Sequence, residues 1–172
     1  MSEQQPQQPQ QPAQPPQPTF AVERIYVKDL SLEIPNAPEV FTQREAPRVD
    51  IQMHTEGKAV AEGVYESVLT ATVTAKFGDK TAFLVEAAQA GIFHIRNVPP
   101  QELDPVLGVT CPNILLPFLR ETVASITQRA GFPPVMLSPL NFEALYMQQR
   151  QQQAAQAQAQ SEAEAQVKPV TH

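Results

Sequence analysis

Hydrophobic and polar residues alternate with a period of two through much of the first half of the chain, and this pattern predicts β-strands. Gly78 and Asp79 interrupt it as a two-residue signal for a type II′ hairpin, so the strands on either side are expected to pair antiparallel. The sequence IPNAP and Gly57 supply earlier breaks. Four strands are therefore expected, over residues 20–32, 48–54, 64–77 and 81–93.

The fourth predicted strand, TAFLVEAAQAGIF, carries apolar or small residues on both faces and one carboxylate, Glu86, in the middle of one of them. The sequence that follows offers two substantial helices, which can cover only one face of a sheet. We therefore expect the second apolar face of this strand to be covered by another subunit or left exposed for a partner. The same holds for the apolar residues that alternate with Thr in the third strand.

After the fourth strand, apolar residues recur at spacings of three and four, which is typical of helices. A short helix is expected over residues 102–109, with Pro105 in its first turn. A long helix is expected within residues 112–131, with Arg129 in its last turn and Gly131 as the C′ residue just beyond it, and another is expected to begin with Asn141 as its N-cap. This order indicates an α+β domain, a four-stranded antiparallel sheet followed by two helices on one face.

The two ends of the 172-residue chain have biased compositions. Residues 1–18 are mostly Gln and Pro, so we expect a disordered arm. Residues 150–172 are rich in Gln and Ala, and we expect them to continue a helix and then form a flexible tail. Residues 19–149 remain as a single domain of about 130 residues, which is enough for one hydrophobic core.

The formal net charge is −6, and Lys and Arg do not cluster, so we expect basic or apolar partners and no nucleic acid. The N-terminus lacks the pattern of a secretory leader, and no run approaches 18 apolar residues. A single cysteine suits a reducing compartment. We therefore expect a soluble cytoplasmic protein without direct membrane insertion.

Catalytic chemistry has weak support in the sequence. Cys111 would need a base to act as a nucleophile, and only His54 and His94 are offered, so a packing role is favoured. The histidines show no metal-ligand spacing, and motifs for nucleotide binding or hydrolysis are absent. We expect no metal, no cofactor and no enzyme activity.

The acidic residues are more informative. Asp29 and Glu33 lie four apart near the end of the first strand and hence on the same side of an extended chain. Glu86 projects from the fourth strand on the same face as Leu84. A solvated surface is the ordinary interpretation of exposed carboxylates. The apolar side chain of Leu84 shares a face with Glu86, however, and this combination of acidic and apolar groups favours a docking patch.

Four motifs in order resemble the SecB family of protein-export chaperones, over about residues 20–149. They are RIYVKDLSLEIPNAPEVF at 24–41, AFLVEAAQAGIF at 82–93, GVTCPNILLPF at 108–118 and LNFEALYM at 140–147. The resemblance implies an ATP-independent chaperone that keeps unfolded precursor proteins translocation-competent in the cytoplasm and delivers them to the SecA export ATPase. It also implies a homotetramer, a dimer of dimers, with sheets paired across a dimer and helices packed between dimers.

The resemblance further implies roles for particular residues, carried over by position. The acidic patch, defined as Asp29, Glu33, Leu84 and Glu86, matches the SecA-binding positions of the family. The positions that influence oligomer assembly are Val85, Ala87 and Gln89, and those of the client-binding groove include Ile51, Met53 and Tyr146. One departure is Glu45, where the family often has a tryptophan.

Two alternatives remain at this point. One is a SecB-like chaperone dedicated to a single partner, such as the antitoxin of a toxin-antitoxin pair. The other is an enzyme that uses Cys111 as a nucleophile.

Overall fold

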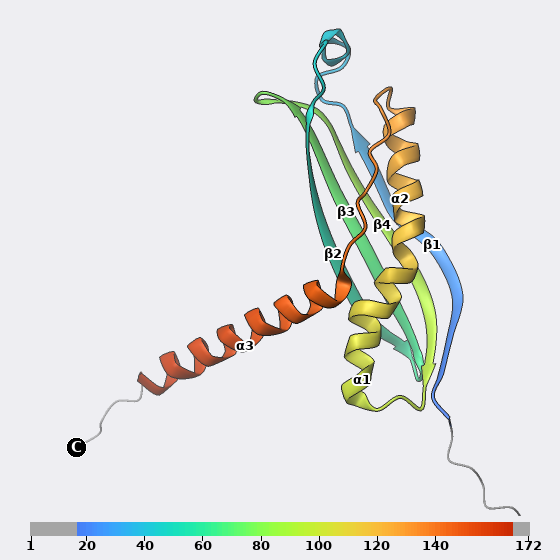
Figure 1. The fold of residues 1–172 in the computed structure, drawn as a ribbon, viewed down its shortest axis with the longest axis vertical. Coiled ribbons are helices and arrows are strands. Elements are labelled where there is room, and N and C mark those ends of the chain that lie inside the picture. Colours follow the sequence, from blue (N-terminus) through green and yellow to red (C-terminus); the bar gives the residue numbers. More distant parts are fainter. Residues whose placement is uncertain (1–16, 167–172) are drawn as a thin grey trace, which may run out of the picture.

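An antiparallel sheet of four strands forms the centre of the fold (Figure 1). The computed structural model describes residues 17–166, with side chains described through residue 158. The strand order is β1-β4-β3-β2, so the first strand pairs with the fourth and not with the second. The strands are β1 (Thr19–Glu33), β2 (Arg48–Ala61), β3 (Val64–Phe77) and β4 (Lys80–Arg96). The predicted four-stranded antiparallel sheet is confirmed.

β3 and β4 form the predicted hairpin, with Phe77 opposite Lys80 across a two-residue turn. Gly78 has a φ of 58°, the positive value that the first central position of a type II′ turn requires. β2 is longer than predicted, because it does not stop near Gly57, which pairs with Ser67 of β3. Pairing along the whole of β3 outweighs the low strand propensity of one glycine.

Helical structure begins earlier than predicted. α1 (Pro100–Pro105) leads through a π-helical segment, η2 (Val106–Thr110), into the long α2 (Cys111–Arg129). Pro105 therefore ends α1 and does not lie in its first turn, so that prediction was wrong. Pro100 takes the first helical position, where a backbone N–H has no partner within the helix. After α2, Gly131 has a φ of 87°, which confirms it as the residue just beyond the helix end.

α3 (Phe142–Gln166) begins at the predicted N-cap, since the Ala144 N–H donates to Oδ1 of Asn141 at 3.0 Å. The helix then projects away from the sheet (Figure 1), so the expectation that two helices cover one face was wrong for α3. Beyond Met147, its Gln/Ala-rich sequence has no apolar stripe to bury. The flexibility of residues 150–166 stays a prediction, and residues 1–16 of the predicted arm and 167–172 of the predicted tail lie outside the described residues.

α2 packs along β3 and β4 and closes a single main core. The helix contributes apolar side chains at spacings of three and four, and the strands contribute alternate residues from the same face. The largest fully buried apolar side chains are Leu69, Val73, Phe83, Val85, Phe93, Leu115, Leu119, Val123 and Phe142. Among residues 17–166, no helix has both the length and the apolar character needed to cross a bilayer.

The second face of β4 is covered from within the chain. Tyr26 of β1 packs against Ala88 and Ala90 of β4 together with Val68 of β3, and Ala90 is fully buried. The expectation that another subunit or partner must cover this strand was therefore wrong for these residues. It was also wrong for the apolar residues that alternate with Thr in β3, because Leu69, Ala71 and Val73 are completely buried in the core beneath α2. Alanine side chains are short, so one neighbouring tyrosine ring is enough to remove them from water.

Candidate docking and client-binding surfaces

β1 departs twice from strict alternation, and these departures decide which side chains share a face. Register shifts lie between Val22 and Arg24 and between Val27 and Asp29. At the second shift, Lys28 is the extra residue, so Asp29 pairs with Ala88 and remains on the face opposite α2. We call this the helix-free face. Without the shift, alternation from Val27 would turn Asp29 toward the core.

The acidic patch lies together on the helix-free face, as the sequence predicted. Across β1 and β4, Glu33 pairs with Leu84 and Ser31 pairs with Glu86. The next pair on the same face is Asp29 with Ala88. Asp29, Glu33 and Glu86 are exposed, and Leu84 is half-buried. Residues opposite and diagonal to one another in a sheet are close enough to meet one partner surface. The structure thus brings these four residues together, and their role in binding SecA stays a prediction.

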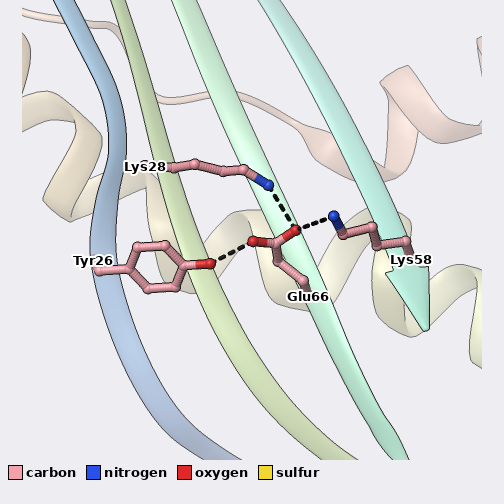
Figure 2. Close-up of polar contacts among 4 residues, drawn as sticks. All are labelled: Tyr26, Lys28, Lys58 and Glu66. Atoms are coloured by element: carbon pink, nitrogen blue, oxygen red, sulfur yellow. Dashed lines mark hydrogen bonds and ion pairs between the residues drawn. The ribbon is translucent and has the colours of Figure 1, made fainter. Parts of the chain in front are cut away.

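A second polar cluster, which we call the Glu66 cluster, lies on the same face (Figure 2). Tyr26 and Lys28 reach across β4 from β1 toward Glu66 on β3, and Lys58 reaches toward it from β2. The Tyr26 hydroxyl donates to Oε1 of Glu66. The ammonium nitrogens of Lys28 and Lys58 lie 2.7 Å and 3.0 Å from Oε2. Three strands are thereby joined through one carboxylate.

Glu66 is only 6% exposed, whereas the carboxylates of the acidic patch are open to water. Burial by itself raises the pKa of Glu66, but hydrogen bonds from Lys28, Tyr26 and Lys58 outweigh it and bring the pKa to about 2. The hydrogen bond to Glu66 in turn raises the pKa of Tyr26 to about 12. The cluster therefore contains an ionised carboxylate and a protonated phenol at neutral pH.

The predicted assembly residues lie on the opposite face, beneath α2. Val85 and Ala87 are completely buried, and Gln89 is 4% exposed. Gln89 also meets the helix directly, because the Thr122 hydroxyl donates to its Oε1 at 3.3 Å. These side chains face α2 of their own chain, so any influence on assembly would act through the position of that helix.

The predicted client-binding residues lie where β2, η2 and the start of α3 meet. Tyr146 borders two hollows of about 330 Å³ and 270 Å³, and Met53 lines the second. Ile51 lies two residues along β2 on the same face and is 39% exposed. The structure thus brings Met53 and Tyr146 together, with Ile51 continuing the apolar stripe. Their contact with clients stays a prediction.

Two glycines allow the π-helical segment to pack closely against β2 and α3. A Cβ on Gly108 would lie 2.7 Å from Cδ2 of Tyr146, so this ring rests directly on the glycine backbone. A Cβ on Gly57 would lie 3.3 Å from Cβ of Leu107, a contact that a small shift could absorb. Gly108 is therefore the residue that permits the observed position of Tyr146.

Sequence reasoning missed the roles of Glu66 and Gly108. The one available signal for Glu66 was a carboxylate inside a strand otherwise rich in Val and Thr. Gly108 carried no signal, because its importance depends on a side chain 38 positions away.

Cys111 is fully buried at the start of α2, and burial raises the pKa of its thiol to about 12. A thiol with this pKa is not ionised at neutral pH and is a poor nucleophile. The structure therefore supports the packing role that the sequence favoured for this residue.

The fold resembles that of a SecB-like chaperone. A SecB-like chaperone of Mycobacterium tuberculosis, solved in complex with a ChAD peptide from the HigA1 antitoxin, superposes with a TM-score of 0.58. The match covers 71% of this chain and 88% of that one at 17% sequence identity, so it bears on the fold alone.

The family follows from the sequence matches. The family model described as SecB, preprotein translocase subunit SecB, matches residues 13–153. Proteins named protein-export protein SecB from Chromobacterium violaceum and Methylobacillus flagellatus are each 61% identical over 131 residues. These matches cover 76% of this chain and 87% and 83% of the two relatives. The chain belongs to the SecB family of protein-export chaperones, which confirms the resemblance.

Proposed function

We propose that this protein binds unfolded precursor proteins in the cytoplasm, keeps them translocation-competent without ATP, and delivers them to SecA. The observation that carries the proposal is the separation of two unlike surfaces on opposite faces of one sheet. The helix-free face holds the acidic patch. The opposite face holds the apolar stripe of β2 and the hollows beside Tyr146. A client and an acidic-patch partner could then bind at the same time.

Apolar side chains near β2 support the role in client binding. Val49 and Ile51 are each 39% exposed, and Leu145 and Met147 at the start of α3 are 44% and 63% exposed. An unfolded chain loses conformational entropy on binding, so its affinity must come from many contacts over a wide surface. Methionine side chains suit varied clients because they are flexible and polarisable.

The edge strand β1 supports assembly into a homotetramer of paired dimers. Its backbone forms one edge of the sheet, and an unpaired edge can accept a strand from another chain. Apolar side chains on its helix-covered face are left open to water beside α2. They are Phe20, Val22, Val27 and Leu30, each between 41% and 48% exposed. Pairing two copies through β1 would extend the sheet and remove this stripe from water.

The test is a capture experiment with two readouts. A denatured, slow-folding precursor is diluted into buffer with this protein and no ATP, and complex mass and client refolding are followed. We expect a client-bound complex and arrested refolding. In the Glu86→Lys variant, client capture should persist while SecA affinity falls roughly tenfold, because a like charge replaces an attractive one at the patch.

Glu102→Lys is the matched control, since it makes the same charge change on exposed α1, away from the helix-free face. Equal SecA affinity in Glu86→Lys and the unmodified protein would contradict the docking assignment. A folded protein that ignores denatured precursors would favour the alternative of a chaperone dedicated to one partner. We prefer general export clients because relatives that are 61% identical are named export proteins.

A further inference from the structure

We propose that Glu66 sets the charge of the docking face, by holding Lys28 away from the carboxylates of the acidic patch and by offsetting part of the charge of Lys28 and Lys58. Glu66 is thus a positioning residue for a basic partner, although it lies outside the acidic patch. This inference rests on the proposed function of the helix-free face in docking SecA.

The register shift in β1 makes such a residue necessary. It places Lys28 and Asp29, which are neighbours in the chain, on the same face of the sheet. A lysine ammonium on a flexible stem next to a carboxylate would tend to pair with it. Such a pair would cancel charge at one end of the acidic patch.

The structure holds the Lys28 ammonium elsewhere. Its nitrogen lies 2.7 Å from Oε2 of Glu66, on the far side of β4 (Figure 2). The small side chains of Ala88 and Ala90 leave space for Tyr26 to lie across β4 and donate to the other oxygen of Glu66. Burial of Glu66 among these donors makes this carboxylate a stronger partner for Lys28 than an exposed one would be.

Loss of the Glu66 charge would change the face in two ways. The Glu66 carboxylate and the ammonium groups of Lys28 and Lys58 together carry a net charge of about +1. Removal of the carboxylate charge would raise this net charge by one unit. Lys28 would also be released and could approach Asp29. Both effects oppose a basic partner, chiefly by slowing its association, and both should weaken as salt screens the charges.

The experiment measures SecA association rates at low and high salt for a charge-matched set of variants. Glu66→Gln keeps the size of the side chain and removes its charge, and we expect a roughly three- to tenfold slower association at low salt. Glu56→Gln removes an exposed carboxylate from the same face and should have a smaller effect.

The decisive comparison is between two double variants, in which Glu66→Gln is combined with either Lys28→Met or Arg24→Met. Lys28→Met should restore the association rate to within about twofold, because the released ammonium is removed. Arg24→Met makes the same charge change on the same strand and face, opposite Ile92, and should restore little. A purely structural role for Glu66 predicts rescue by neither.

The outcomes separate this inference from the proposed function. If Glu86→Lys leaves SecA binding unchanged, the docking face itself is wrong. If Glu86→Lys weakens SecA binding but Glu66→Gln does not, the role of Glu66 is overturned. The same conclusion follows if Arg24→Met restores the association rate of Glu66→Gln to the same extent as Lys28→Met. Should Glu66→Gln fail to fold, Glu66→Asp keeps the charge but shortens the reach, and it should show a smaller loss that Lys28→Met again repairs.

Discussion

At the scale of single residues, Glu66 shows how a buried carboxylate can be stable when it is fully partnered. It is 6% exposed and meets three donors from two other strands. A buried charge without partners would strongly destabilise the fold, so the donors and the carboxylate depend on one another. This dependence links the stability of the sheet to the ionisation of Glu66.

The link predicts a pH dependence with a definite sign. The pKa of Glu66 is lowered from 4.5 to about 2, so its contribution is fully present above pH 4.5 and is lost as pH falls toward 2. Allowing for the partial exposure of the lysines, we expect that contribution to be about 1–2 kcal/mol. The measurement is urea unfolding of the unmodified protein and Glu66→Gln across this range. A stability difference that stays constant from pH 6 to about pH 2 would contradict the linkage.

At the scale of elements, local patterns predicted strands and caps well, and contacts between elements were missed. β3 matches its predicted bounds, because alternation and the Gly78 turn are both local signals. The bulge at Lys28 and the π-helical segment were not predicted, because neither follows from the local periodicity of the sequence. The acidic patch was predicted correctly as a group sharing one face, whereas Glu66 required knowledge of which strands pair.

Gly108 in the π-helical segment gives a prediction at this scale. Gly108→Ala should displace Tyr146, since the new Cβ would lie 2.7 Å from its ring, and client affinity should fall about three- to tenfold. Stability should change little, because alanine is more favourable than glycine in a helix by up to about 1 kcal/mol. This gain offsets the cost of displacing the Tyr146 ring. Client binding and thermal unfolding are compared with Gly57→Ala, whose Cβ has a more tolerant contact of 3.3 Å. Unchanged client affinity in Gly108→Ala would remove Tyr146 from the proposed groove.

At the scale of the whole molecule, one sheet separates two surfaces of opposite character, and α2 packs on one of its faces. The exposed stripe of β1 and the outward side of α2 are both available to other copies in the proposed tetramer. Val85, Ala87 and Gln89 are buried between the sheet and α2, and Gln89 accepts a hydrogen bond from Thr122 of that helix. Their predicted influence on assembly is therefore indirect.

Ala87 allows this indirect influence to be tested. Ala87→Leu adds bulk to a completely buried position beneath α2, which should cost about 1–3 kcal/mol and move the helix outward. We expect a larger fraction of dimers at the expense of tetramers, measured as mass by light scattering at several protein concentrations. Thr70→Leu adds bulk to the helix-free face and is the control. An unchanged mass distribution in a destabilised Ala87→Leu variant would show that assembly does not depend on α2 in this way.

The sequence by itself determined where the four strands lie, the β3–β4 hairpin, the C-terminal end of α2, the N-cap of α3, and the family. These features depend on residues within a few positions of one another, where alternation, turn residues and caps act directly. The tertiary structure decided that β1 lies beside β4, that Tyr26 covers the alanines there, and that Glu66 gathers two lysines. Those contacts join residues far apart in the chain, and they exist only once pairing and register have set which side chains meet.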